Sequence, residues 1–219
     1  MHKKNTIRIS PQSSIVFFKR ILYAVFKKYT ITILYHERKR GVIMTYLETD
    51  RLRLRNVALK DADIMYDYRN NEICARYQRG QTKDYAGITT LVEKRKNDRI
   101  STERPFFVAV AMKDSDEMVG EIVVMPNDGT ISLGYTFSYR HHRKGYAYEA
   151  LSALIYLLHT QYPEWDFISF TEPENEPSMA LLRKLGYKDM GYVPSVESQA
   201  FGKWTTPATE AEISQATKK

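Results

Sequence analysis

Cysteine is nearly missing from this chain of 219 residues, in which Cys74 stands alone. A single cysteine cannot close an internal disulfide, so the sequence favours a reducing compartment and we expect a cytoplasmic protein. The chain also lacks any group of Cys and His residues at metal-ligand spacing, and we expect no bound metal. Cys74 itself is better explained as a buried structural thiol than as a reactive one.

Long uncharged hydrophobic runs are absent as well. The most apolar segment, residues 15–35, is interrupted by Lys19, Arg20, Lys27 and Lys28. It therefore offers no run near the ~18 uncharged residues that a membrane-spanning helix needs. The pattern excludes a spanning helix in this part of the chain.

Acidic residues are scarce in the same region. Residues 1–43 hold ten Lys and Arg but only one acid, Glu37, and carry a charge of +9, while the rest of the chain carries −2. Two interpretations of residues 1–43 stay open. They are a basic amphipathic helix at a membrane surface, or an extension that is loosely ordered or not part of the native protein. Because the remainder is nearly neutral, the basic composition does not indicate nucleic-acid binding.

Two nucleotide-binding motifs, G-x-x-x-x-G-K-[ST] and G-x-G-x-x-G, are also absent. The stretch HHRKGYAYEAL, residues 141–151, nevertheless lies where a β-rich alternating run gives way to an apolar run with helical spacing. The first turn of a helix has unpaired N–H groups and a positive dipole end, which favour an anion. Gly145 and Ala147 leave the backbone open to phosphates, and Arg143 and Lys144 add positive charge. A plain turn is the alternative for a lone glycine at such a joint.

This stretch resembles the acetyl-CoA loop of the GNAT superfamily of N-acetyltransferases, especially its RimJ/RimL-like branch. The loop of that family runs Q/R-x-x-G-x-G/A and is often followed by Glu-Ala. Two positions depart from the pattern: His142 stands where Gln or Arg is usual, and Arg143 where the branch often has Gly. The resemblance implies that the loop binds the pyrophosphate of acetyl-CoA. The residues that it assigns to the cofactor are His142, Arg143, Lys144, Gly145, Tyr146, Ala147 and Tyr148.

A second stretch, residues 172–192, resembles the second GNAT signature, N-x-x-S/A-x-x-L-x-x-K-x-G-F/Y. The residues that fit it are Asn175, Ser178, Leu181, Lys184, Gly186 and Tyr187. The residues themselves favour a helix in this stretch, because Pro177 suits a first helical turn and Gly186 suits a helix C-terminus. The resemblance implies that Asn175 and Ser178 contact the cofactor. Simple N-capping by Asn175 is the alternative, and it is compatible with that role.

The order of expected elements agrees with this family. Strands are predicted over 47–55, 106–112, 118–125, 131–139 and 166–171, with two more near the C-terminus. Helices are predicted after a cap at Asp61, from Thr82 or Asp84 to about Lys96, from about Gly145 to Tyr162, and between Pro177 and Gly186. The resemblance implies an α/β (α+β) GNAT fold. Its mixed, mostly antiparallel sheet of about six or seven strands is flanked by helices and contains a splayed central parallel pair. We expect the domain over 44–206, after the extension 1–43 and before a loose polar tail over 207–219.

The implied reaction moves an acetyl group from acetyl-CoA to a primary amine, by direct attack in a ternary complex. By the resemblance, a backbone N–H near Phe137 contacts the thioester carbonyl. Glu121 is the candidate base, as a half-buried carboxylate near apolar side chains, and a solvent-facing strand carboxylate is the alternative. Many relatives protonate the leaving thiolate with a Tyr at the position of Leu182, which cannot do so, and Ser178 is the candidate substitute.

Two questions stay open at this point. A non-catalytic acyl-CoA-binding sensor of the same fold competes with the enzyme hypothesis, and Leu182 is the residue in its favour. Turnover with any amine excludes the sensor. The sequence does not identify the acceptor amine, which is a protein N-terminus or a small molecule, and it does not decide between a monomer and a homodimer.

Overall fold

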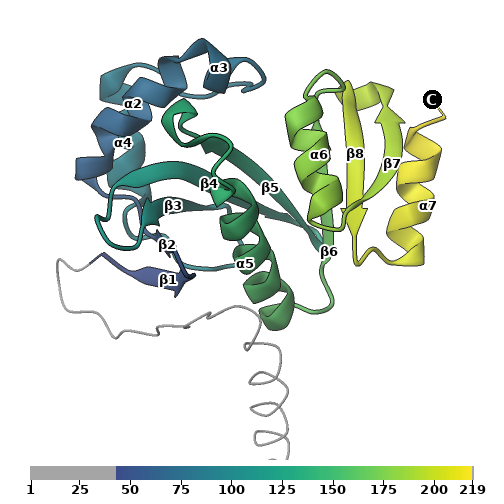
Figure 1. The fold of residues 1–219 in the computed structure, drawn as a ribbon. Helices are drawn as coiled ribbons and strands as arrows, with labels where there is room; N and C mark the ends of the chain where they lie inside the picture. The colour runs from purple at the N-terminus through teal and green to yellow at the C-terminus, as the bar shows by residue number, and fades with distance from the viewer. Residues whose placement is uncertain (1–42, 219) are drawn as a thin grey trace, which may run out of the picture.

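The computed structural model describes residues 43–218, so the predictions for the basic extension fall, apart from Ile43, outside the described range. Within that range eight strands form one sheet in the order β1-β2-β3-β4-β5-β6-β8-β7 (Figure 1). The strands are β1 Thr45–Glu48, β2 Leu52–Arg55, β3 Phe106–Met112, β4 Met118–Asn127, β5 Thr130–Phe137, β6 Asp166–Thr171, β7 Lys188–Val193 and β8 Ser198–Lys203. This mixed, mostly antiparallel architecture confirms the expected fold class.

Helices flank the sheet. They are α2 Ala62–Asn70, α3 Glu72–Ala75, α4 Tyr85–Arg95, α5 Tyr146–Gln161, α6 Glu176–Lys184 and α7 Pro207–Ala216, with short 3-10 turns η1 Leu59–Asp61, η2 Tyr139–His141 and η3 Pro194–Val196. Over residues 43–218, no helix combines the length and the apolar character that crossing a bilayer requires.

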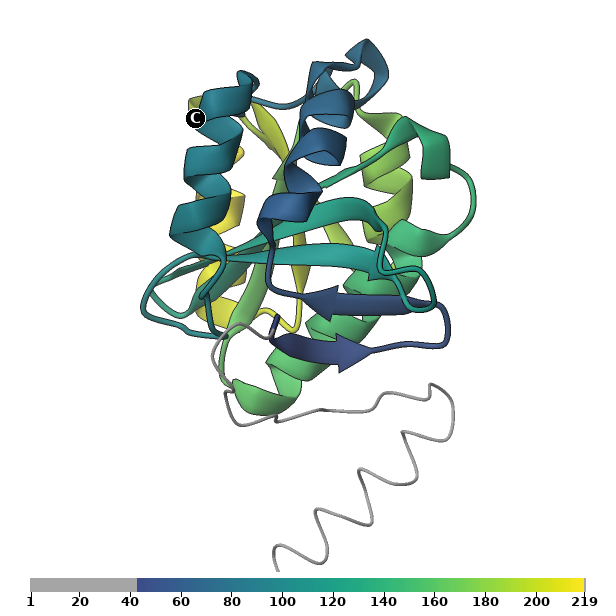
Figure 2. The same cartoon turned by 90° about the vertical axis from the view of Figure 1, so that its left-hand side faces the viewer.

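The two faces of the sheet pack against different helices, because side chains alternate along each strand. Leu154 of α5 belongs to the same hydrophobic cluster as Val108 of β3. Tyr68 of α2 and Ile88 of α4 belong to a second cluster with Phe107, the neighbouring residue on β3. Figure 2 shows α2 and α4 side by side. The helices predicted to flank an acceptor groove therefore lie across the sheet from α5.

The first strand differs from its prediction. The alternation over residues 47–55 predicted one strand, but the chain reverses near Asp50 and β1 pairs with β2 as an antiparallel hairpin. Thr49 holds the reversal, because its N–H donates to the Leu52 carbonyl at 2.8 Å and the Leu52 N–H donates to its hydroxyl at 3.0 Å. The extra strand brings the sheet to eight strands rather than six or seven.

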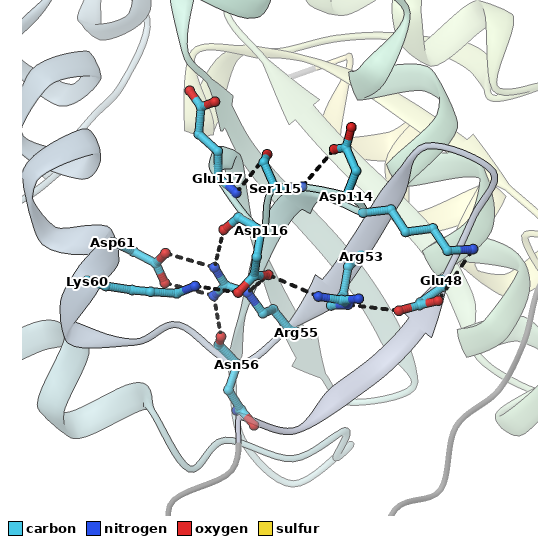
Figure 3. Close-up of polar contacts among 11 residues, drawn as sticks. Glu48, Arg53, Arg55, Asn56, Lys60, Asp61, Asp114, Ser115, Asp116 and Glu117 are labelled. Carbon is cyan, nitrogen blue, oxygen red and sulfur yellow. Dashed lines mark hydrogen bonds and ion pairs between the residues drawn. The ribbon is translucent and has the colours of Figure 1, made fainter.

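A buried arginine joins this hairpin to its neighbours. Arg55 is 1% exposed and donates to both oxygens of Asp61, at 2.8 and 2.9 Å, and to Asp116 at 2.8 Å (Figure 3). Lys60 also pairs with Asp116. Asp61 therefore precedes α2 as predicted, but its side chain accepts from Arg55 and from the Ala58 N–H instead of capping that helix.

Strands β3, β4 and β5 form the predicted antiparallel meander that leads to the loop at Arg143. Asp128 and Gly129 connect β4 to β5 with φ of 40° and 76°. Two successive residues in the left-handed region are typical of a tight hairpin turn, which the Asn-Asp-Gly sequence predicts.

The parallel pair splays apart soon after it forms. β5 pairs with β6 only at Thr130 with Asp166 and at Ile131 with Phe167. The Ser132 hydroxyl then donates to the Ile168 carbonyl at 2.7 Å. Beyond this point the two strands diverge (Figure 1). This is the splayed central pair that the resemblance implied.

The expectation of a loose tail over residues 207–219 does not match the structure, which places α7 there. The Thr206 hydroxyl accepts from the Thr209 N–H at 3.3 Å, and Pro207 occupies the first helical turn. The Thr206 N–H and hydroxyl each donate to Asp166 at 3.0 Å. A Thr-Pro start is a helix signal that polar composition alone concealed.

Candidate active site

The loop between β5 and α5 has the backbone of an anion site. Arg143 and Gly145 both have positive φ, 63° and 80°, as in the backbone concavities that bind anions through successive N–H groups. α5 begins at Tyr146, and the Glu149 N–H donates to the Gly145 carbonyl at 3.1 Å. The amides of Tyr146 and Ala147 precede that bond, so helix geometry gives them no intrahelical acceptor. The helix start predicted near Gly145 is confirmed.

This loop is open to a ligand. Residues 142–145 are exposed, including the cationic side chains of Arg143 and Lys144. A Cβ built on Gly145 would have Nη2 of Arg51, at 3.5 Å, as its neighbour. The positive φ independently favours glycine at this position. Both observations make Gly145 the point where a ligand can approach the main chain.

His142 lies in the same loop but contacts the end of β5. Its Nε2 lies 2.9 Å from the carbonyl oxygen of Phe137. The Cys74 thiol donates to the same carbonyl at 3.3 Å, and burial raises the pKa of that thiol. Cys74 is therefore the buried thiol that the sequence predicted. The His142 ring joins the loop to β5, so the loop offers a ligand its backbone rather than this side chain.

The two sequence signatures meet in space. Lys184 closes α6, and its Nζ lies 4.5 Å from the ring centroid of Tyr148 in the first turn of α5. This distance is typical of a cation–π contact. Two motifs that are separate in the sequence therefore form one surface beside the loop.

The start of α6 shows the N-cap role that was considered for Asn175. Its Oδ1 accepts from the Ser178 N–H at 3.2 Å, which is an N-cap. The Ser178 hydroxyl lies 2.8 Å from the phenol oxygen of Tyr135. α6 is thus capped as predicted, and the cap brings Ser178 against β5. Leu182, one turn further along α6, is 3% exposed and packs in the core.

Tyr135 is a site residue that the sequence analysis missed. It lies on β5 two positions before Phe137, and both side chains belong to the α5 face of the sheet. Burial raises the pKa of the Tyr135 phenol, and the Ser178 hydroxyl partly offsets that rise. Strand alternation could have placed Tyr135 on the Phe137 face. Its contact with Ser178 joins residues 43 apart and needed the tertiary structure.

Backbone groups of β5 also point into the splay. The Ser138 N–H donates to the Val119 carbonyl at 2.9 Å, which makes these two residues a hydrogen-bonded pair of the β4–β5 ladder. Such pairs alternate along an antiparallel ladder, so the N–H and C=O of Phe137 and Tyr135 point away from β4 and toward β6. Pairing with β6 stops at Ile131. The Phe137 N–H thus has the direction that the sequence-based expectation required.

The environment of Glu121 differs from both interpretations of the sequence, the half-buried base and the solvent-facing carboxylate. Glu121 is 3% exposed on β4, and it is neither half-buried nor solvent-facing. One oxygen accepts from Arg69 at 2.7 Å and from Gln81 at 3.0 Å, and the other accepts from Arg69 at 3.2 Å and from the Tyr68 hydroxyl. Four donors fill the lone-pair positions of a carboxylate. Glu121 can therefore accept a further proton only after a donor leaves, which argues against the predicted base role.

The loop between α3 and α4 connects β5 to the segment that follows β6. The Tyr77 hydroxyl donates to the Glu174 carbonyl at 3.0 Å, and Arg79 pairs with Glu172 at 2.5 Å. From the same loop, Gln78 donates to the Tyr135 carbonyl at 3.1 Å. We call residues 77–81 the strap. It bridges the β5–β6 splay on the side of α2 and α4, and the sequence indicated only a polar loop here.

The described residues, 43–218, contain no group of His, Cys, Asp and Glu side chains arranged to hold a metal ion. The side chains gathered around the loop and the splay are instead hydroxyl, amide and cationic groups. Such groups bind phosphates and amides.

A sequence profile described as "Acetyltransferase (GNAT) domain" matches residues 51–188. The match begins just before β2, includes the Gly145 loop, the diverging strands β5 and β6 and α6, and covers more than half of the chain. The chain belongs to the GNAT acetyltransferase family. The family membership expected from the two signatures is therefore confirmed, whereas the RimJ/RimL-like branch is not decided by the match.

Proteins that are similar to this chain are also named acetyltransferases. The chain is 26% identical over 149 residues to the uncharacterized N-acetyltransferase YnaD of Bacillus subtilis (strain 168), a match covering 67% of this chain and 85% of YnaD. A GNAT-family acetyltransferase structure from Bacillus anthracis superposes with a TM-score of 0.61 at 22% identity, over 73% of this chain and 96% of that one. The structure of RimL, a ribosomal L7/L12 alpha-N-protein acetyltransferase, in complex with coenzyme A gives 0.60 at 12% identity, over 70% and 94%.

Proposed function

We propose that this GNAT protein is an N-acetyltransferase that moves an acetyl group from acetyl-CoA to a primary amine while both substrates are bound. Acetyl-CoA would supply the acetyl group as an activated thioester. The observation that carries the proposal is the exposed Gly145 loop at the start of α5, next to the part of β5 that has diverged from β6. The amine belongs to a protein N-terminus or to a small molecule.

The residues present fit this cosubstrate. Residues 142–148 would hold the pyrophosphate through backbone N–H groups, with Arg143 and Lys144 adding charge. The backbone of Phe137 would face the acyl end from the edge of β5. Asn175 offers an amide to the pantetheine arm. An extended arm that lies along an unpaired strand edge uses the same contacts as an added strand.

A proton for the leaving thiolate would come from Ser178, whose oxygen would take the phenol proton of Tyr135 in return, and the phenolate would regain a proton from solvent. Because burial raises the pKa of Tyr135, its phenol stays protonated at neutral pH and can donate to the Ser178 oxygen. The Ser178 proton is then free to point toward another acceptor. This pair supplies a donor although Leu182 occupies the position where many relatives have Tyr. Ser178 acts here as the catalytic residue, and Tyr135 orients the Ser178 hydroxyl and returns its proton.

The acceptor amine would approach from the face of α2, α4 and the strap. Glu121 lies on this face, but its four donors favour a structural role over the base role that the sequence predicted. Glu121 would keep α2 and the strap fixed on the sheet. The amine proton would leave through solvent, which meets the exposed parts of the strap.

Two finer assignments belong to the same proposal. We infer that the chain falls in the RimJ/RimL-like branch, because within the family the stretch 141–151 resembles that branch especially. We also infer a cytoplasmic protein, because the single cysteine is buried and cannot form an internal disulfide.

The test is thermal unfolding of the full chain with and without acetyl-CoA. A ligand at about 100 times its Kd should stabilise the fold by about 2.7 kcal/mol, which raises Tm by several degrees. Gly145→Glu should remove this rise. The matched control is Gly129→Glu, because Gly129 has a similar φ of 76° but lies in the β4–β5 turn. The control should lose intrinsic stability and keep the rise.

No rise with the unchanged chain, or an equal rise with Gly145→Glu, would overturn the proposed donor site. Release of free thiol from acetyl-CoA in the presence of a panel of amines separates the enzyme from the sensor. The enzyme releases thiol with at least one amine. A sensor shows the Tm rise without amine-dependent thiol release.

A further inference from the structure

The first turn of α5 contains an acid at the place where the proposed function requires an anion. Glu149 lies one turn into α5, directly after the Gly145 loop. A carboxylate near a helix N-terminus interacts favourably with the helix dipole, and it therefore opposes a phosphate that uses the same dipole. Its charge has to be compensated if the loop is to bind an anion well.

Arg51 provides this compensation from the β1–β2 turn. Its Nη2 and Nε lie 2.6 and 2.7 Å from one oxygen of Glu149, and its backbone N–H donates to the other oxygen at 3.1 Å. The Thr49 hydroxyl donates to that second oxygen at 2.5 Å. The carboxylate is thus neutralised and held toward the turn, on the side of α5 where β1 and β2 lie.

The same guanidinium holds the loop. Nη1 of Arg51 donates to the Lys144 carbonyl at 3.0 Å, and its Cζ lies 4.6 Å from the ring centroid of Tyr146. In a trans peptide the C=O and the following N–H point in opposite directions, so this bond leaves the Gly145 N–H on the far side of the peptide from Arg51. Arg51 thereby contacts residues on both sides of Gly145.

We propose that Arg51 is a positioning residue for the pyrophosphate of CoA, acting by cancelling the Glu149 charge and by fixing the Lys144 peptide. This inference rests on the proposed function of the Gly145 loop. Arg51 forms an ion pair with Glu149, so its charge is compensated there. Arg51 therefore contributes to phosphate binding by positioning the loop and not as a direct ligand.

The test measures CoA binding to the full chain by calorimetry. Arg51→Ala should weaken CoA binding about tenfold, which corresponds to about 1.4 kcal/mol. The reason is that the Glu149 carboxylate, in the helix turn that would bind the anion, then has no countercharge. Glu149→Gln should bind about three times more tightly than the unchanged chain, since the Arg51 charge is released. The double variant should recover most of the affinity that Arg51→Ala loses. Arg53→Ala is the matched control, because Arg53 pairs with Glu48 and Asp116.

The outcomes separate this inference from the function on which it rests. If the unchanged chain does not bind CoA, the donor site itself fails. If the chain binds and Arg51→Ala binds equally well, only the role of Arg51 fails. Charge cancellation is overturned if the folded double variant binds as weakly as Arg51→Ala, or if Glu149→Gln binds more weakly than the unchanged chain. Circular dichroism of each variant identifies any that do not fold.

Discussion

At the scale of single residues, the hydroxyl pair of Tyr135 and Ser178 is the proposed substitute for the Tyr that many relatives have at the position of Leu182. The two oxygens are 2.8 Å apart, and they join β5 to α6 across the splay. Either hydroxyl can be the donor, and in the proposed mechanism the protonated phenol donates to the Ser178 oxygen. The serine proton is therefore the one available to a leaving thiolate.

Ser178→Ala should lower kcat about 100-fold, the smallest rate loss typical of removing a general acid. The rise in Tm with acetyl-CoA should stay nearly unchanged. Tyr135→Phe should lower kcat by about tenfold, because Ser178 keeps its hydroxyl but loses its orientation. Steady-state kinetics with the amine found in the panel measures both effects. Tyr192→Phe, at an exposed position on β7, is the control. A Ser178→Ala variant with full kcat would remove Ser178 from the mechanism.

At the scale of elements, Glu121 is the point where α2 and the strap are fastened to the central strands. Its carboxylate contacts Tyr68 and Arg69 of α2 and Gln81 of the strap. Burial raises the pKa of Tyr68 well above its ordinary value, and the Glu121 charge adds to this rise. Tyr68 is therefore a donor that stays protonated. Glu121 thus links α2, the strap and β4 through one buried carboxylate.

Glu121→Gln should destabilise the protein by about 3–5 kcal/mol, because it leaves the buried Arg69 guanidinium without its countercharge. For a chain of this size that loss lowers Tm by roughly 6 °C or more. Thermal unfolding followed by circular dichroism measures it. Glu93→Gln removes a pair with Lys96 that is 45% exposed on both sides, and Tm should barely change. An unchanged Tm for Glu121→Gln, together with a large loss of kcat, would instead support the base role.

At the scale of the whole molecule, the sheet consists of two halves joined by a short parallel contact. β1 to β5 form one half and β6, β8 and β7 the other, with two residue pairs between them. The strap and the Tyr135–Ser178 pair bridge the same gap. The outer edge of the first half depends on the buried Arg55 network (Figure 3), so global stability should respond to the charges in that network.

Asp116 makes this response dependent on pH. Burial alone would raise the pKa of its carboxyl, but hydrogen bonds from Lys60 and Arg55 outweigh burial and lower that pKa below 3.8. A lowered folded-state pKa means that the stabilisation is fully present above the unfolded-state value and is lost as pH falls through the folded-state value. Asp116→Asn should therefore lower Tm at pH 6, and the difference from the unchanged chain should shrink below about pH 4. A difference in Tm that stays constant from pH 6 to pH 3 would contradict this assignment.

The sequence by itself determined the parts of this protein that are set by neighbouring residues. The strand β6, the start of α5 at Gly145, the Asp128-Gly129 turn and the Asn175 cap all follow from local rules, because turn dihedrals and helix ends depend on a few adjacent side chains. The two signatures likewise located the loop and α6. The reversal near Asp50 and the helix α7 depended on single cap and turn contacts that composition and alternation conceal.

Only the tertiary structure decided which distant side chains share the site. The Arg51–Glu149 pair joins residues 98 apart in the sequence, the Tyr77–Glu174 bond joins residues 97 apart, and Glu121 finds Arg69 52 positions away. No periodicity encodes such partners, because they depend on how the hairpin, the strap and the helices pack on the sheet. The fold and the position of the Gly145 loop could therefore be predicted from the sequence. The environment of Glu121 and the contacts on which the proposed roles of Arg51 and Tyr135 rest follow from long-range packing.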